Sequence, residues 1–118
     1  MSKRSQKLFL KDILESIERI ESYTKGLSYN DFLNDRKTID AVLRNLEVIG
    51  EAVKNLSEKL KKLYPEVNWK RIAGMRDRLI HGYFGVDIEI VWETIQSRLP
   101  ELKKQIEKIL KEIDYNIE

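Results

Sequence analysis

One run of the chain, from about Asp35 to Leu63, contains no proline and repeats apolar residues at three- and four-residue spacing. That spacing is typical of one face of an α-helix. We therefore predict one long helix here, about 40 Å long at 1.5 Å per residue, as the spine of the fold. Its apolar face comprises Ile39, Val42, Leu43, Leu46, Ile49, Val53, Leu56 and Leu60.

The opposite face of this predicted spine is charged. It carries Arg44, Glu47, Glu51, Lys54 and Glu58, again at three- and four-residue steps, so opposite charges can pair along it. Surface pairs of this kind usually contribute little to stability. We interpret the face as plain solvated surface.

The residues before the spine also have a helical pattern. Apolar residues repeat from Leu10 to Ile20, and this first helix is expected to end near residues 23–26. Ser28 is expected to cap a short helical turn, because Asp31 three residues on completes a form of the capping box.

Three breaks divide the residues after the spine. Tyr64-Pro65 should end the spine, because proline lacks an N–H and disfavours helix in the preceding residue. Asn68 can then cap a helix over about 69–80, and Asp87 can cap another that runs to residue 99. Pro100 is expected to start or kink the last helix, since proline is tolerated in a first helical turn. The apolar residues of that last helix are Leu102, Ile106, Ile109, Leu110 and Ile113.

Length and composition agree with a helical protein of one domain. The 118 residues fit a single core. The charged fraction of 36% is closer to that of a charged helical protein, and the hydrophobic fraction of 42% argues against disorder. No alternating run is long enough for a strand. The sequence therefore predicts an all-α antiparallel bundle of four to six helices, in one domain over residues 1–118.

Charge is nearly balanced over the whole chain, with 22 basic and 20 acidic residues. A net charge of +2 excludes a polycation that coats nucleic acid without specificity. Two local runs are basic enough to face phosphates. They are Lys3, Arg4, Lys7 and Lys11 near the start, and Lys70, Arg71, Arg76 and Arg78, which only Asp77 offsets.

The chain has no cysteine and a single histidine. This excludes disulfides, thiolate catalysis and cysteine-based or histidine-rich metal sites. The basic start of the chain lacks the apolar core of a signal peptide, and no run approaches the roughly 18 apolar residues of a membrane span. We expect a cytoplasmic protein with no membrane segment.

That single histidine, His81, is the natural candidate for proton transfer, because histidine is the side chain whose unperturbed pKa lies near neutrality. A histidine in the last turn of a helix can also simply satisfy terminal carbonyls. Asp77 lies four residues earlier, on the same helical face, where its carboxylate can fix the imidazole tautomer.

Arg76 lies five residues before His81, about 140° away around the helix axis. One regular helix therefore cannot easily aim both groups at one point. Either the helix end distorts near Gly82, or the pair acts across an interface with a second copy of the chain.

The pattern Arg-x4-His-x-Tyr, formed by Arg76, His81 and Tyr83, resembles the signature of the HepT proteins in the HEPN superfamily of helical ribonucleases. The resemblance extends over most of the chain. It includes the spine segment 40–52, the approach to the motif at 69–75, and residues 84–92 followed by Leu99-Pro100.

The resemblance implies a HEPN-type homodimer whose motif helices face each other, and RNA cleavage without a metal ion or cofactor. Arg76, Asp77 and His81 are then the catalytic residues, and a two-fold axis would also supply a second histidine. Lys70, Arg71 and Arg78 are candidates to contact RNA phosphates.

The resemblance further implies a toxin that is paired with a minimal nucleotidyltransferase antitoxin, called MntA, which attaches AMP to Tyr83. Such a group would place bulk and negative charge beside Arg76 and His81. Two other interpretations remain open at this point. The chain can be a non-catalytic subunit that binds a nucleotide or docks the nucleotidyltransferase, or a purely structural helical dimer.

Overall fold

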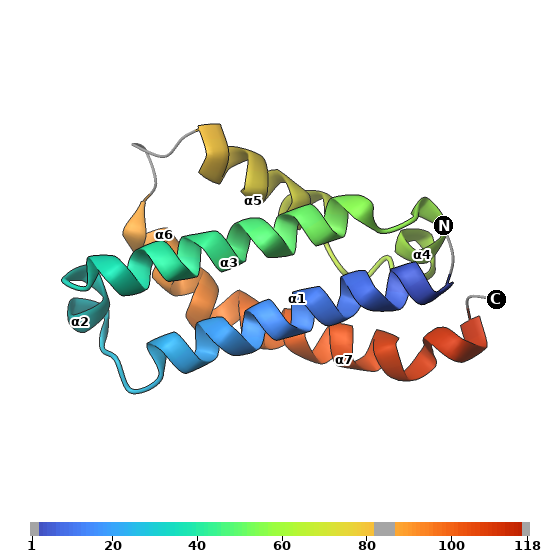
Figure 1. Cartoon of the computed structure of the whole chain (residues 1–118), viewed down its shortest axis with the longest axis horizontal. Coiled ribbons are helices and arrows are strands. Elements are labelled where there is room, and N and C mark those ends of the chain that lie inside the picture. The colour runs from blue at the N-terminus through green and yellow to red at the C-terminus, as the bar shows by residue number, and fades with distance from the viewer. Residues whose placement is uncertain (1–2, 82–86, 117–118) are drawn as a thin grey trace.

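The protein is all-helical over the residues that its structure, a computed structural model, describes, namely 3–81 and 87–116 (Figure 1). The helices are α1 (Lys3–Thr24), α2 (Tyr29–Leu33), α3 (Arg36–Asn55), α4 (Glu58–Leu63), α5 (Trp69–His81), α6 (Ile88–Glu93), a π-helical turn η2 (Thr94–Arg98) and α7 (Leu99–Asn116). Because α6, η2 and α7 follow one another without a gap, the described chain forms six rods, within the predicted four to six.

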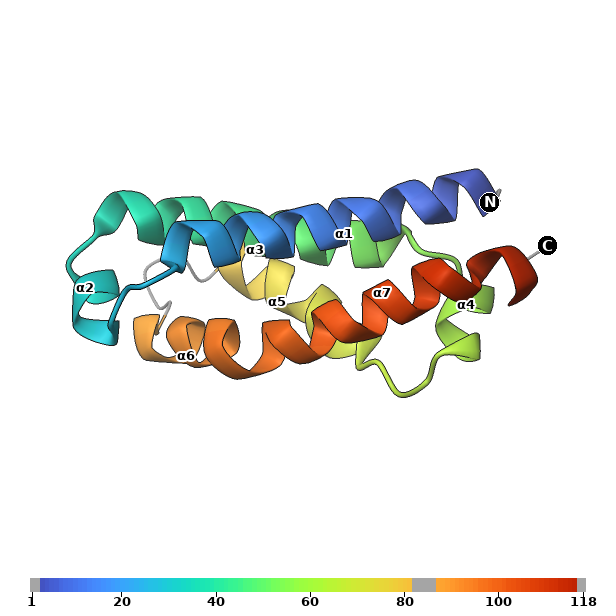
Figure 2. The ribbon, with the colours of Figure 1, turned by 90° about the horizontal axis from the view of Figure 1, so that it is seen from below.

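Two long helices, α1 and α3, lie side by side in opposite directions, and α7 packs along α1 (Figures 1 and 2). Helix α5 lies on the other flank of α3. The start of α1 and the end of α7 lie at the same end of the bundle in both views. None of the described helices is long and apolar enough to cross a membrane.

The core follows the predicted apolar stripes. Fully buried positions include Leu10, Ile13, Ile17 and Ile20 of α1, Val42, Ile49 and Val53 of α3, and Ile106 and Ile113 of α7. Helix α2 closes one end of the bundle, where the ring of Phe32 lies 5.1 Å from that of Trp92 on α6.

The predicted caps are confirmed. Ser28 and Asp31 form a reciprocal capping box at the start of α2. The side-chain oxygen of Asn68 accepts a hydrogen bond from the backbone N–H of Arg71 at 3.1 Å, and Asp87 accepts one from Glu89 at 2.9 Å. These bonds satisfy donors that a helix start leaves without partners.

The prediction of one uninterrupted spine over 35–63 is wrong. The helix stops at Asn55, Leu56 is extended with a ψ of 144°, and Ser57 caps α4 by accepting from the N–H of Leu60. The side chain of the buried Gln6 accepts a hydrogen bond from the N–H of Ser57 at 2.8 Å. Tertiary contact with α1 therefore stabilises the break, while Leu56 and Leu60 stay buried on either side of it.

Pro100 begins the last helix, as predicted, but without a break before it. Helix α7 starts at Leu99, directly after the π turn, in which the N–H of Leu99 bonds to the carbonyl of Thr94. Proline in a helix clashes with the carbonyl four residues before it, here that of Gln96. The carbonyl of Gln96 lies within the wider π turn, which makes room for the proline ring, so the helix continues into α7.

Candidate active site

Helix α5 carries Arg76 and His81 of the motif, and it meets α3 at a close approach between Gly50 and Arg76. A Cβ atom added to Gly50 would lie 2.5 Å from the Cβ of Arg76 and 3.3 Å from its Cα. Gly50 is buried, so only the lack of a side chain lets the two backbones come this close. The side chain of Arg76 therefore begins at a fixed position in the α3–α5 interface.

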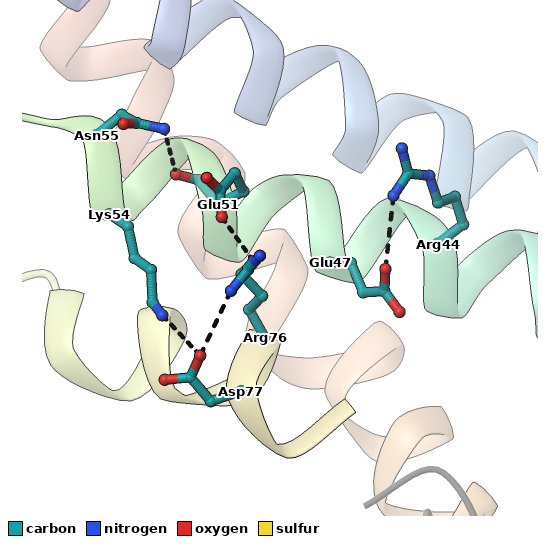
Figure 3. A network of polar contacts seen from close by, with 7 residues as sticks. All are labelled: Arg44, Glu47, Glu51, Lys54, Asn55, Arg76 and Asp77. Carbon is teal, nitrogen blue, oxygen red and sulfur yellow. Dashed lines mark hydrogen bonds and ion pairs between the residues drawn. The ribbon is translucent and has the colours of Figure 1, made fainter. Parts of the chain in front are cut away.

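The guanidinium of Arg76 bridges the two helices. Its Nε lies 2.6 Å from Oε2 of Glu51 on α3, and its Nη1 lies 3.5 Å from Oδ1 of Asp77 on α5 (Figure 3). The Arg76 side chain is 30% exposed. It is thus held from the protein side and still reached by solvent.

Asp77 is held in turn by α3. Its Oδ1 lies 2.6 Å from the Nζ of Lys54, one turn beyond Glu51 (Figure 3). Glu51, Arg76, Asp77 and Lys54 therefore form one chain of alternating charge across the seam between the two helices. We call these four residues the seam network.

The backbone of α5 is helical through His81, so the predicted spacing holds for the positions around its axis. His81 is four residues after Asp77, on the same side of the helix, and about 140° from Arg76. The side chain of His81, the predicted helix end at Gly82 and the whole of Tyr83 lie outside the described residues.

A groove of about 1080 Å³ lies between α5 and the rod of α6, η2 and α7, and Asp77 of the seam network is among its lining residues. Arg71 and Arg78 line it from α5 and Arg98 lines it from η2, with Leu46 and Met75 among its apolar residues. Arg71 and Arg78 share a face because they are seven residues apart, nearly two full turns.

The predicted basic patch is therefore divided rather than continuous. Arg71 and Arg78 line the groove, Arg76 enters the seam network, and Lys70 lines a separate depression with Lys61 and other residues at the start of α5. The structure brings Arg76 and Asp77 together, at 3.5 Å, and Asp77 also lines the groove with Arg71 and Arg78, whereas Lys70 lies apart.

Glu51 and Lys54 contact Arg76 and Asp77, although their spacing in the sequence predicts a solvated face. Their three-residue spacing on the spine was visible, but their partners lie 25 and 23 residues further along the chain. The position of Arg98 in the groove could not be predicted either, because Arg98 lies outside any recognisable sequence motif. Among the described residues, no three or more acidic or histidine side chains are placed to hold a metal ion.

Comparison with known proteins identifies the family of the chain. Residues 13–109 match the family described as Ribonuclease HepT-like. A Thermococcus cleftensis protein named "Probable ribonuclease HepT" is 50% identical over 92% of this chain and 99% of its own length. Two proteins, each named "Putative RNase", are 50% identical over 97% of the chain in Methanocaldococcus jannaschii, covering 94% of that relative, and 49% identical over 86% in Caldanaerobacter subterraneus, covering 91%.

No solved structure gives a significant match to the chain. The family match covers most of the residues, and it includes both helices of the seam and the motif that α5 carries. The chain therefore belongs to the ribonuclease HepT-like family.

Proposed function

We propose that this protein is an endoribonuclease that cleaves RNA without a metal ion, with Arg76, Asp77 and His81 as its catalytic residues. The observation that carries the proposal is the setting of the Arg76 guanidinium, which pairs with Glu51 at 2.6 Å and is still partly exposed to solvent. It lies on a helix that ends in the only histidine of the chain. The names of the relatives support RNA as the substrate.

The proposed step is attack of an RNA 2′-hydroxyl on its neighbouring phosphate. A base removes the hydroxyl proton, an O–P bond forms, the bond to the 5′-oxygen breaks, and an acid protonates that oxygen. The products are a 2′,3′-cyclic phosphate and a 5′-hydroxyl. His81 exchanges the protons, Asp77 orients it, and Arg76 stabilises the negative charge on the phosphate oxygens.

The step needs two copies of the chain. One histidine serves as base or acid but not as both at once, and about 140° separates Arg76 from His81 around α5. A two-fold axis beside α5 would supply the second histidine. Ile90 on α6 is 60% exposed and offers apolar surface for such an assembly.

Purified protein tests the activity. We expect RNA cleavage in excess EDTA with 2′,3′-cyclic phosphate ends, and loss of it in both Arg76→Ala and His81→Ala while the helical circular dichroism signal remains. Cleavage that persists in His81→Ala contradicts the mechanism. Tight binding to a nucleotidyltransferase with no cleavage in any preparation would instead favour the non-catalytic docking subunit.

The phosphates that flank the cleaved bond require further contacts, which we assign to Lys70, Arg71 and Arg78. All three side chains are exposed. Replacing one of them should weaken RNA binding similarly for all sequences and reduce the salt dependence of binding, because each phosphate contact releases counterions.

We further propose that the protein is a toxin neutralised by a nucleotidyltransferase of the MntA type, which transfers AMP from ATP to Tyr83. The transfer forms a bond between the tyrosine oxygen and the α-phosphorus and releases pyrophosphate. Intact mass after incubation with the nucleotidyltransferase and ATP should rise by whole AMP units in the wild type and not in Tyr83→Phe. An equal rise in Tyr83→Phe contradicts this modification site.

A further inference from the structure

Arg76 can place its guanidinium in many directions, because the side chain rotates about several bonds. The close approach at Gly50 fixes where the side chain begins, since the Cβ of Arg76 lies where a side chain of residue 50 would be. It does not fix where the guanidinium ends. A second contact is needed at the charged end.

Glu51 provides that contact on one edge of the guanidinium. Its carboxylate lies 2.6 Å from Nε, whereas Asp77 lies 3.5 Å from Nη1, which is longer than an ordinary charged hydrogen bond. The guanidinium carries N–H donors on both its Nε edge and its terminal Nη edge. The strong contact is therefore on the Nε edge, and the terminal edge has only the weaker one.

We propose that Glu51 is a positioning residue for the reaction proposed above, on which this inference rests. It holds the Nε edge of Arg76 so that the terminal Nη edge is presented to the RNA phosphate. A phosphate that pairs with two parallel N–H groups needs this edge in one orientation, and a guanidinium that is already held there meets the phosphate in the reactive geometry.

Holding Arg76 with a carboxylate has a second consequence. The negative charge of Glu51 competes with phosphate for the same cation, so it should lower the affinity of Arg76 for RNA while raising the rate of cleavage. A purely structural contact would not separate these two quantities. The seam is also exposed at Glu51, whose side chain is 52% accessible, so its loss should change stability little.

The chain offers a matched control in Glu47, one turn before Glu51 on the same helix. Glu47 pairs with Arg44 at 3.5 Å (Figure 3). Replacing Glu47 removes the same charge from the same face without touching Arg76. Both substitutions should therefore have equal effects on net charge and on helix propensity.

The test compares Glu51→Ala, Glu51→Gln and Glu47→Ala in single-turnover cleavage at saturating RNA, and in binding to an all-2′-deoxy analogue that lacks the attacking hydroxyl. For Glu51→Ala we expect a rate about 10- to 100-fold lower, as for a misplaced catalytic group. Affinity for the analogue should stay equal or become tighter. Glu51→Gln should be intermediate, because its amide oxygen can still accept from Nε, and Glu47→Ala should match the wild type.

Thermal denaturation excludes loss of folded protein as the cause, and each Tm should stay within about 5 °C of the wild type. If the wild type cleaves RNA and Glu51→Ala cleaves as fast as Glu47→Ala, the positioning role is wrong and the proposed function stands. A parallel fall in rate, affinity and Tm also overturns it, in favour of a structural contact. If the wild type does not cleave RNA, the proposed function fails and this inference fails with it.

Discussion

The two sides of helix α3 are built differently. One side is an apolar stripe within the main core, where Val42, Ile49 and Val53 are fully buried. The other side meets α5 through Gly50 and the seam network, and of the described α5 residues only Trp69 is buried. The first side is apolar and buried, while the second combines one close backbone approach with exposed charges.

This difference separates stability from chemistry on a single helix. Apolar burial supplies most of the favourable free energy of folding, whereas exposed ion pairs supply little. Groups that bind and react must meet solvent and substrate, so they belong on the side that contributes least to folding. Substitutions on the apolar side should therefore lower mainly the stability of the protein, and those on the seam side should lower mainly its activity.

The largest effect is expected in the apolar core that the first side of α3 joins, where Ile17 of α1 is fully buried. Ile17→Ala should lower the free energy of unfolding by about 2–5 kcal/mol, because it removes apolar contacts and leaves a cavity. Urea denaturation measures this loss. The cleavage rate per folded molecule should equal that of the wild type, and a lower rate at full folding would break the separation of the two sides.

Gly50 tests the close approach, with Gly74 of α5 as its control. Gly50→Ala places a methyl group 2.5 Å from the Cβ of Arg76, so we expect a loss of about 1–3 kcal/mol and a lower cleavage rate. A Cβ at Gly74 meets nothing within 4 Å. Gly74→Ala should instead stabilise the protein by about 0.5–1 kcal/mol, since alanine favours helix. Equal denaturation midpoints for the two variants would show that the helices do not touch at Gly50.

Lys54 tests the charged part of the seam. Lys54→Met should cost less than about 1 kcal/mol of stability and lower cleavage a few-fold, because Asp77 loses its partner at 2.6 Å. The difference from the wild type should shrink as salt rises, since the pair is partly exposed. Single-turnover rates at two salt concentrations measure this, with Lys59→Met on α4 as the control. A deficit that does not depend on salt would count against an electrostatic role.

The smallest effect is expected at the start of α3, where Asp35 caps the helix. Its carboxylate accepts hydrogen bonds from the Oγ1 of Thr38 at 2.7 Å and from its N–H at 3.1 Å, and these bonds lower the pKa of Asp35 below the ordinary 3.8. A lowered pKa means that the ionised carboxylate stabilises the fold above that ordinary value. This stabilisation is lost as the pH falls through the lowered pKa.

Thermal denaturation of the wild type and Asp35→Ala at several pH values checks this effect. The Tm difference should be a few degrees and constant above about pH 5, and it should shrink below pH 3.8. A difference that persists unchanged at the lowest pH would mean that the cap acts without its charge.

Much of the fold could be predicted from the sequence because it depends on local signals. Ser28, Asn68 and Asp87 cap helices through residues two or three positions away, and the apolar stripes follow the helical period. The break at Ser57 was missed because Leu56 and Leu60 keep that period across it. The hydrogen bond from the N–H of Ser57 to Gln6, 51 residues away, supports that break, and the apolar period does not show it.

The candidate site could likewise be predicted only where it depends on local spacing. Spacing alone placed Asp77 beside the position of His81 and Arg76 away from it, and the helical backbone of α5 agrees. The partners of Arg76 and Asp77 could not be predicted, because Glu51 and Lys54 have the same spacing as any solvated helical face. Which face α5 would cover depends on Gly50, whose role appears only when two helices are packed together.

The order of contacts along the chain has a consequence for synthesis. Helix α7 packs on α1, and the ion pair of Lys103 with Glu21 at 2.9 Å joins residues 82 positions apart. The α3–α5 seam joins residues only 23 to 26 positions apart. The seam can therefore form in a growing chain before α7 has been made, when α7 does not yet cover the apolar side of α1. Until α7 has been made, the apolar residues of α1 that pack against it stay exposed on the nascent chain, which is a condition that favours aggregation.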